Sequence, residues 1–155
     1  MLSRRKFISS STIALGFLMG GAFASPVISA SRRMQVYKSP WCGCCGAWVE
    51  HIIANGFEVD VTEMDDVTPV KNSYGISSEL HSCHTAVIDG YVIEGHVPAS
   101  DIERLILERP DAKGLAVPGM PIGSPGMEQG GSRDPFNVVI FNEDSIAVFS
   151  RYSGA

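Results

Sequence analysis

Three of the four cysteines in this 155-residue chain fall within four consecutive positions, Cys42-Gly43-Cys44-Cys45. The preceding segment, 34–37, alternates apolar and polar residues like a half-buried strand, and Pro40 ends it. The following segment, 44–55, has apolar residues at helical spacings of three and four. The cysteines therefore occupy a junction between a strand and a helix N-terminus. The free N–H groups and partial positive charge of a helix N-terminus stabilise thiolate over thiol, so this cluster is predicted to be a chemical site.

The rest of the chain alternates strand and helix patterns. After the first strand and helix, the patterns predict a strand over 57–61, a helix over 67–74 and a hairpin of 85–88 and 91–94 around Asp89-Gly90. They then predict a helix between Pro98 and Pro110 with Ser100 or Asp101 near its cap, a long Gly/Pro loop over 114–135, and a last hairpin of 137–141 and 145–151. This order predicts an α/β fold. We expect it to be thioredoxin-like, with a central mixed sheet, flanking helices and an additional C-terminal hairpin, because thioredoxin-like domains keep reactive thiols between the first strand and the first helix.

The first residues form an export signal. Arg4, Arg5 and Lys6 precede an apolar, acid-free stretch that ends in small residues at Ala24. The paired arginines match the twin-arginine pattern, and the alternatives are an ordinary secretory signal or an uncleaved anchor. We predict a signal peptide over 1–24, with a second cleavage end at Ala30, a linker over 25–33 and the domain over 34–155. The mature protein is then expected in the periplasm.

Charge and hydropathy exclude two classes of partner. The chain carries a net charge of −5, and loss of the three basic residues in 1–24 leaves −5 − 3 = −8. A domain this acidic gains nothing from phosphate electrostatics, so we expect no nucleic-acid partner. No segment after the signal approaches the ~18 apolar residues of a membrane span, so we expect no membrane insertion after signal removal.

The cysteine cluster has three competing interpretations. Cys42 and Cys45 have the C-x-x-C spacing of dithiol oxidoreductases. With Cys83, the cluster instead supplies four soft sulfur ligands for Cu(I) or zinc. The adjacent side chains of Cys44 and Cys45 diverge by about 100° on a helix, which suits thiolate-bridged, polynuclear Cu(I) better than one tetrahedral zinc. An inert disulfide, Cys42–Cys45 or Cys45–Cys83, is the third interpretation. We favour the metal site.

Cys83 comes just before the third predicted strand, in Ser82-Cys83-His84-Thr85-Ala86. In an extended segment Cys83 would share a face with His81 and point away from His84, although a turn would reverse this. His84 is kept as a second-tier ligand. An ordinary hydrogen-bonded histidine is the alternative.

Further candidates lie elsewhere in the chain. Met120 and Met127 in the Gly/Pro loop are second-tier ligands, because a thioether binds Cu(I), and the alternative is that they anchor the loop in an apolar groove. His51 lies seven residues after Cys44, about 10 Å along the helix, so we expect a structural role. His96 is expected to brace the following helix.

Taken together, these motifs resemble one family. The resemblance is carried by the segments 38–45, 56–57, 82–86, 90–91, 94–98, 114–121 and 123–127, with Trp48 and His51. They are similar to small exported bacterial metal-binding proteins catalogued as a domain of unknown function, among them the CopG copper-resistance proteins. The resemblance covers nearly all of the mature chain, and the leader is the one departure from it.

The resemblance implies a thioredoxin-like fold and copper binding through Cys42, Cys44, Cys45 and Cys83. It also implies copper handling outside the cytoplasm, with interconversion of Cu(I) and Cu(II). We therefore expect a periplasmic copper-binding protein for copper resistance, whose partners are copper ions and another periplasmic copper-handling protein. The alternatives are a copper chaperone, or an enzyme acting as a copper or thiol–disulfide oxidoreductase. An enzyme is the less favoured expectation.

Overall fold

A computed structural model describes residues 32–128 and 130–154 of the chain. The predicted signal peptide and most of the predicted linker lie outside these residues. The elements in chain order are β1 (Arg33–Lys38), α1 (Gly43–Ala54), β2 (Glu58–Glu63), α2 (Thr68–Ser73), the 3₁₀ turn η1 (Ser78–Leu80), β3 (His84–Ile88), β4 (Tyr91–Glu94), α3 (Ala99–Glu108), β5 (Gly114–Ala116), β6 (Phe136–Phe141) and β7 (Ile146–Tyr152).

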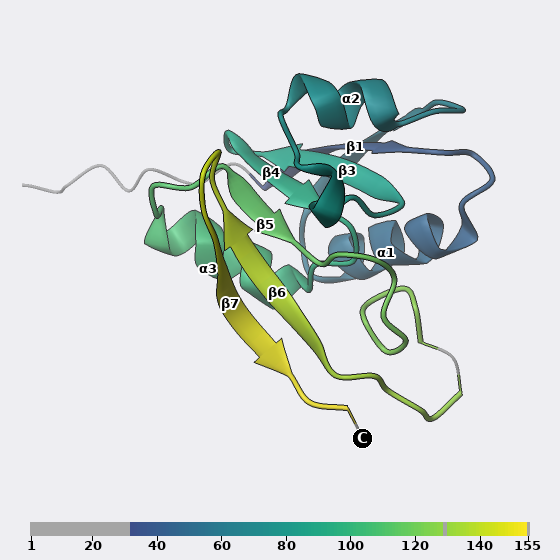
Figure 1. Cartoon of the computed structure of the whole chain (residues 1–155). Helices are drawn as coiled ribbons and strands as arrows, with labels where there is room; N and C mark the ends of the chain where they lie inside the picture. Colours follow the sequence, from purple (N-terminus) through teal and green to yellow (C-terminus); the bar gives the residue numbers. More distant parts are fainter. Residues whose placement is uncertain (1–31, 129, 155) are drawn as a thin grey trace, which may run out of the picture.

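The strands form one seven-stranded sheet in the order β2-β1-β3-β4-β5-β6-β7 (Figure 1). The pairs β1/β2 and β4/β5 are parallel, each joined through a helix, and the other neighbours are antiparallel. A parallel pair needs such a crossover, whereas antiparallel neighbours need only a short turn. The predicted α/β class with a mixed sheet, flanking helices and a C-terminal hairpin is confirmed. The thioredoxin-like arrangement stays a prediction.

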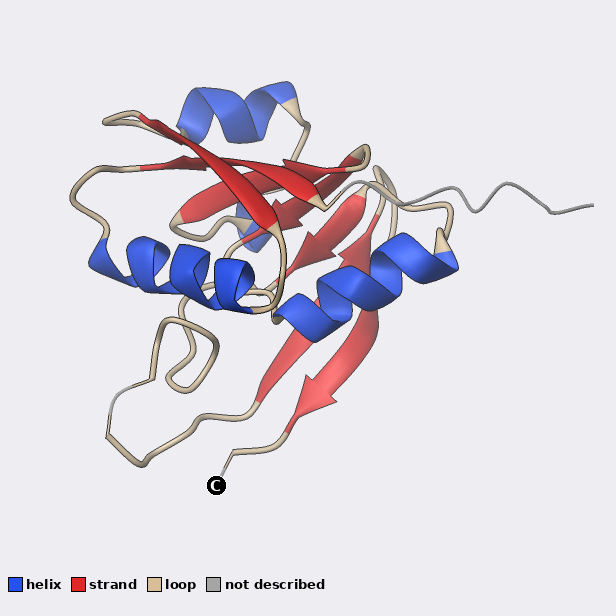
Figure 2. Ribbon diagram, turned by 180° about the vertical axis from the view of Figure 1, so that it is seen from behind, coloured by secondary structure: helices blue, strands red, loops and turns tan. Residues whose placement is uncertain are grey.

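Helices cover both faces of the sheet. Helices α1 and α3 lie on one face and α2 lies on the other (Figure 2). The main core joins the sheet to Trp48 of α1 and to Ile102 and Leu105 of α3, all three fully buried. A smaller cluster on the side of α2 includes Ile76 and Phe141. The N-terminus of α1 is therefore fixed by the packing of its own helix against the sheet.

The predicted loop over 114–135 is wrong at its start, where β5 runs in the middle of the sheet between β4 and β6. Its three residues are buried, and they are too few to show an alternating pattern. Gly114 is required by packing, because a Cβ atom there would lie 1.7 Å from the Val92 carbonyl oxygen. This strand is specified by its neighbours in the sheet rather than by its own periodicity.

Ser100 and Asp101 lie in the first turn of α3, near its cap as predicted, but neither residue is the cap itself. Pro98 is the N-cap residue, and no side-chain cap hydrogen bond is made there. The Asp101 carboxylate instead accepts hydrogen bonds from the hydroxyls of Ser150 and Tyr152, at 2.5 and 2.7 Å, which tie α3 to β7. The Ala99 N–H, a free donor at the helix N-terminus, is satisfied by the imidazole of another helix.

No helix within the described residues is long and apolar enough to cross a membrane.

Candidate metal centre

Cys42 begins helix α1 as its N-cap residue. Its backbone is extended, and its Sγ accepts a hydrogen bond from the Cys45 N–H at 3.3 Å. A sulfur atom thus takes the place of the usual cap oxygen, next to the positive end of the helix. Cys42 and Cys45 form a disulfide, whereas Cys44 and Cys83 are free thiols.

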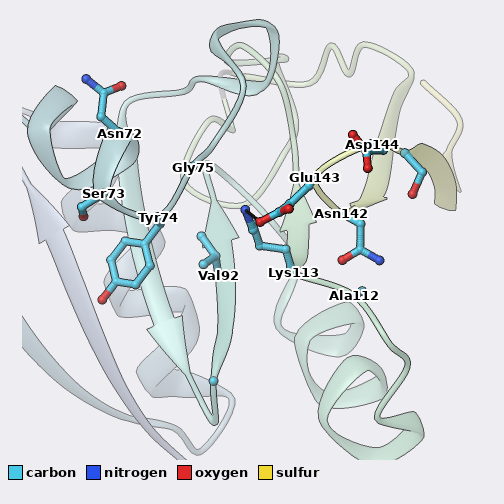
Figure 3. Close-up of a pocket in the computed structure, with 12 residues that line it drawn as sticks. Asn72, Ser73, Tyr74, Gly75, Val92, Ala112, Lys113, Asn142, Glu143 and Asp144 are labelled. Atoms are coloured by element: carbon cyan, nitrogen blue, oxygen red, sulfur yellow. Dashed lines mark ion pairs between the residues drawn. The ribbon is translucent and has the colours of Figure 1, made fainter.

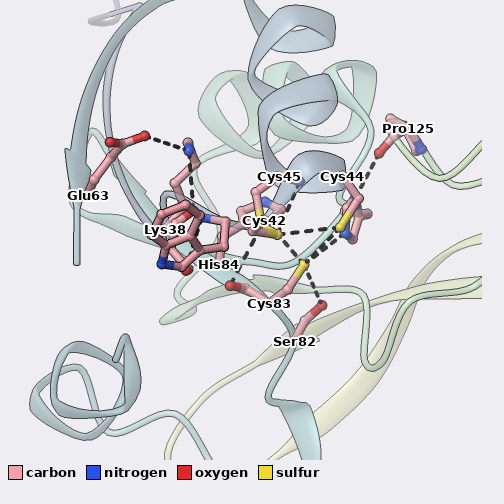
Figure 4. Close-up of a disulfide and its surroundings, with 12 residues drawn as sticks. Lys38, Cys42, Cys44, Cys45, Glu63, Ser82, Cys83, His84 and Pro125 are labelled. Carbon is pink, nitrogen blue, oxygen red and sulfur yellow. Dashed lines mark hydrogen bonds and ion pairs between the residues drawn. A yellow bond between two sulfur atoms is a disulfide. The ribbon is translucent and has the colours of Figure 1, made fainter. Parts of the chain in front are cut away.

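Strand pairing brings Cys83 to this cluster. Lys38 at the end of β1 pairs with His84 at the start of the antiparallel β3. The turn that leads into α1 and the turn that precedes β3 therefore lie at the same end of neighbouring strands. As a result, the Sγ of Cys44 lies 3.5 Å from that of Cys42 and 3.9 Å from that of Cys83 (Figure 4).

Two histidines complete the surroundings of Cys83. Its Sγ lies 3.0 Å from His96 Nε2 and 3.5 Å from His84 Nδ1. The other nitrogen of His96, Nδ1, donates to the Pro125 carbonyl oxygen at 2.9 Å, which leaves a lone pair on the Nε2 that faces the thiol. His84 is fully buried, and among the described residues its Nε2 atom has no hydrogen-bond partner. Both rings are available as ligands.

The expectation that Cys83 points with His81 and away from His84 is wrong, because the Cys83 sulfur faces His84. His81 points elsewhere, with its Nε2 atom 3.0 Å from the Ile76 carbonyl oxygen. The reason is that β3 begins only at His84, so residues 81–83 precede the strand, with a bend at Cys83, and strand alternation does not apply to them. His96 is the site residue that sequence reasoning missed, since it was assigned only a bracing role. Its signal was its place in 94–98, one of the segments that carry the family resemblance.

Burial sets the protonation of the site without metal. Burial, and after it the charge of the neighbouring Cys44 thiolate, raises the pKa of Cys83 to about 12. Burial also lowers the pKa of His84 well below its usual value, with smaller contributions from His96 and Lys71. The pKa of His96 is lowered by burial as well. Neutral imidazoles are the form that binds a metal, while the Cys83 proton must leave when an ion binds.

A buried ion pair fixes the turn that carries Cys83. The Glu94 carboxylate, which is fully buried, accepts hydrogen bonds from the Ser82 N–H at 2.6 Å and from the Thr85 hydroxyl at 2.7 Å. The Lys71 ammonium lies 2.6 Å from the same carboxylate and also donates to the Thr85 hydroxyl at 3.0 Å. Residues on both sides of Cys83 are therefore held by one network.

The Gly/Pro loop packs over the cluster. The Ser82 hydroxyl donates to the Gly119 carbonyl oxygen at 2.5 Å, and Pro125 accepts from His96. Gly126 has a φ of +83°, and a Cβ atom there would lie 2.6 Å from the backbone nitrogen of Trp48. Only glycine combines that backbone conformation with such a close approach to α1. The loop thus contacts the segment that carries Cys83, the side chain of His96 and the first turns of α1.

The other predicted residues lie outside the cluster. His51 has the structural role expected, because its Nε2 accepts the hydrogen bond of the Ala99 N–H at 3.1 Å. Met120 is 54% exposed, and Met127 is partly buried in a turn closed by a hydrogen bond from the Gly123 N–H. Neither thioether makes a described contact with the cysteines, and their second-tier role stays a prediction.

The donor atoms form two overlapping sets. One consists of Cys42, Cys44, Cys45 and Cys83, and the other of Cys83, His84 and His96; within each set the ligand atoms lie within 4.8 Å of one another. Four thiolates and two imidazoles are soft and borderline donors, which suit Cu(I) and zinc far better than magnesium or calcium. With Cys42 and Cys45 reduced, Cys83 could bridge ions held by the two sets.

A cavity elsewhere in the molecule carries no comparable chemistry. It has a volume of about 860 Å³, and its lining includes the end of α2, Lys113 and the turn between β6 and β7 (Figure 3). Its lining residues include no cysteine or histidine, and Lys113 there faces Glu143 at 3.6 Å. The cysteine cluster remains the candidate site.

Comparison with known proteins identifies the family of this chain. A family model described as "Protein of unknown function, DUF411" matches residues 80–127. No curated protein matches the chain. Two solved structures do, "Copper resistance protein copG- Form 1" at 46% identity and a TM-score of 0.75, and its "Form 2" at 45% and 0.74. The first match covers 79% of this chain and 98% of the other, and the second covers 77% and 97%. Identity at this level over most of both chains shows that the chain belongs to the family of CopG-type copper resistance proteins.

Proposed function

We propose that this protein binds copper as Cu(I), in a site made from the thiolates of Cys42, Cys44, Cys45 and Cys83. The observation that supports this most directly is the convergence of all four sulfur atoms within 4.8 Å, from two segments 38 residues apart or more. Sulfur is the donor that Cu(I) prefers. The names of the similar solved structures, copper resistance proteins, support copper over zinc.

The geometry favours more than one copper ion for each chain. Cys44 and Cys45 are neighbours on a helix and diverge, so one tetrahedral ion cannot use both well. Cys83 belongs to the four-sulfur set and also faces His84 and His96, which makes it a natural bridging ligand. We therefore propose His84 and His96 as additional copper ligands beside the four cysteines.

The proposed biological role is copper resistance in the periplasm. The support comes from the sequence pattern over 1–24, which predicts a twin-arginine-type leader, and from the names of the related structures. Because the twin-arginine route exports folded proteins, copper could bind before or after export. Fractionation of cells that express the full chain tests the location, and copper sensitivity of a strain lacking the protein tests the role.

Titration of the reduced protein against a competing Cu(I) chelator tests binding. We expect tight binding of more than one Cu(I) per chain, and both Cys44→Ser and Cys42→Ser should lower the stoichiometry. His51→Asn is the matched control on the same helix, and its stoichiometry should equal that of the unsubstituted protein. Absence of a tight site, or an unchanged stoichiometry in Cys44→Ser, would contradict the proposal.

A second candidate function is thiol–disulfide exchange, favoured by the disulfide between Cys42 and Cys45. Such a cycle needs these two cysteines and makes no use of Cys44. Reduction of a disulfide-bonded test peptide by the Cys44→Ser variant therefore separates the two functions. A third candidate, a copper chaperone, requires transfer to a partner protein and is tested by copper exchange with periplasmic copper-binding proteins.

A further inference from the structure

We infer that the free edge of β7 is a docking strand for a second copy of this chain. In the inferred dimer two β7 strands pair antiparallel about a two-fold axis, and the two seven-stranded sheets continue into one another. The inference goes beyond the proposed function and does not rest on it. The cysteine cluster lies at the ends of β1 and β3, and β3 is four strand spacings from β7, roughly 19 Å.

The two edge strands of the sheet, β2 and β7, differ in character (Figure 1). Charged side chains line β2, where Glu58 and Asp60 form ion pairs with Arg33 of β1. Charged residues on an edge strand hinder its pairing with another strand. In β7, by contrast, the segment 146–150 carries no charge and no proline. Strand β7 is therefore the edge that is open to pairing.

The backbone groups of Ile146 and Val148 face the free side of β7. The Asn142 N–H donates to the Ser145 carbonyl oxygen at 2.9 Å, so these two residues form a hydrogen-bonded pair at the β6/β7 turn. Bonded and non-bonded pairs alternate along an antiparallel ladder, so Ala147 occupies a bonded position and its two neighbours occupy non-bonded ones. The N–H and C=O groups of Ile146 and Val148 are therefore directed to an incoming strand.

One register of two β7 strands uses these groups and also matches the side chains. With Ala147 on the two-fold axis, Ile146 lies opposite the partner's Val148, and Val148 lies opposite the partner's Ile146. Each of these pairs exchanges two backbone hydrogen bonds. The two side chains, 45% and 44% exposed in the single chain, lie on the α2 side of the sheet beside Phe141 and Val139 of β6. Pairing gives each of them an apolar neighbour across the new ladder.

The same register brings opposite charges together at both of its ends. Arg151 is exposed and has no ion-pair partner among the described residues. Glu143 and Asp144 are exposed in the turn before β7, and the Glu143 side chain stays 82% exposed although it lies 3.6 Å from Lys113. Arg151 is four residues after Ala147, and Glu143 is four residues before it. Arg151 of one copy therefore meets the acidic turn of the other copy, and this contact occurs twice in the dimer.

A β-bulge at Phe149 limits the length of the contact. Phe149 has no partner in β6, and its carbonyl oxygen accepts a hydrogen bond from Arg104 of α3 at 2.9 Å. The ladder between the copies therefore ends at Val148. A contact this short is smaller than a standard protein interface, so we expect an equilibrium between single chain and dimer, with a Kd above about 1 µM.

Sedimentation equilibrium of the reduced, copper-free protein from about 1 µM to about 1 mM tests the inference. We expect the average mass to rise from that of one chain toward that of two. Arg151→Glu alone, and Glu143→Lys/Asp144→Lys alone, should each weaken association by about tenfold or more, because like charges then meet at both ends. An equimolar mixture of these two variants should restore association, because both contacts again join opposite charges. Glu50→Lys, at an exposed position of α1, is the matched control and should associate like the unsubstituted protein.

Ala147→Cys tests the register. On the free side of β7, position 147 faces its own copy in a non-hydrogen-bonded pair, where opposite side chains are close enough for a disulfide. Mild oxidation should therefore join two copies at position 147. Thr62→Cys, on the exposed β2 edge, is the matched control and should give no link between copies. Peptide mass spectrometry distinguishes these links from disulfides of the native cysteines.

Three results would overturn the inference. A single chain at every concentration would leave the β7 edge to a strand of another protein. Association that both charge variants retain, or a link at position 62 and none at position 147, would place the contact elsewhere. Restored association in the mixture requires that both charge variants are folded, and the link at position 147 decides the matter if one is not. Because the substitutions lie far from the cysteines, Cu(I) titration of the same variants should match the unsubstituted protein and tests the proposed function separately.

Discussion

The buried pair of Lys71 and Glu94 offers the sharpest test of how the fold positions Cys83. Both side chains are almost inaccessible, with side-chain exposures of 6% and 0%. Replacing Glu94 by glutamine keeps the shape and an oxygen that can accept from the Ser82 N–H. It removes the negative charge and leaves the Lys71 ammonium buried without a counter-ion. The substitution therefore isolates the charge from the packing.

The expected loss of stability is large. Breaking a buried ion pair by removing one partner typically costs about 3–5 kcal/mol, because the remaining charge is uncompensated. Since glutamine retains part of the hydrogen bonding, we expect Glu94→Gln to cost about 3 kcal/mol. The matched control is Glu143→Gln, because the Glu143 carboxylate that faces Lys113 is exposed, and there the same change should cost roughly 0–1 kcal/mol.

Urea unfolding followed by circular dichroism measures these values, and a double-mutant cycle tests their cause. Adding Lys71→Met to Glu94→Gln removes both charges, so the double variant should be more stable than Glu94→Gln alone. Copper titration of Glu94→Gln should show weakened affinity with unchanged stoichiometry, because Cys83 is displaced rather than lost. A cost below 1 kcal/mol, or additive effects in the cycle, would refute the argument that the pair holds this turn.

Other predictions follow from single contacts. His51→Asn should lower the free energy of unfolding by about 1 kcal/mol in urea unfolding, because the Ala99 N–H loses its acceptor. Burial lowers the pKa of His51, so below the ordinary histidine pKa of about 6.5 this side chain binds more protons in the unfolded chain than in the folded one. The stability that His51 contributes should therefore fall as the pH drops below that value. Unfolding curves of His51→Asn should lack this pH-dependent component. Gly126→Ala should lower the melting temperature and weaken copper binding, since the loop must move away from Trp48, and wild-type values in calorimetry and titration would contradict this. Asp101→Asn should cost about 1–3 kcal/mol by weakening the tie between α3 and β7, and an unchanged urea midpoint would show that this tie is dispensable.

Much of the fold was predictable because it depends on neighbouring residues. The alternation in β1, the helical spacing in α1 and the Asp89-Gly90 turn between β3 and β4 are local patterns, and each element formed where it was expected. Strand β5 was not predictable in this way. Its three residues carry no period, and they join the sheet because β4 and β6 leave a place for them.

The sequence by itself determined that three cysteines stand at the N-terminus of α1, because the strand, the turn and the helix around them are all local. Only the tertiary structure decided what meets them. The antiparallel pairing of β1 with β3 brings Cys83 to Cys44, and the hydrogen bond to Pro125 aims His96 at Cys83. Contacts between residues far apart in the chain depend on the packing of whole elements, which no local periodicity encodes. For the same reason, a close pair of free thiols, Cys44 and Cys83, could be distinguished from a bonded pair only in three dimensions.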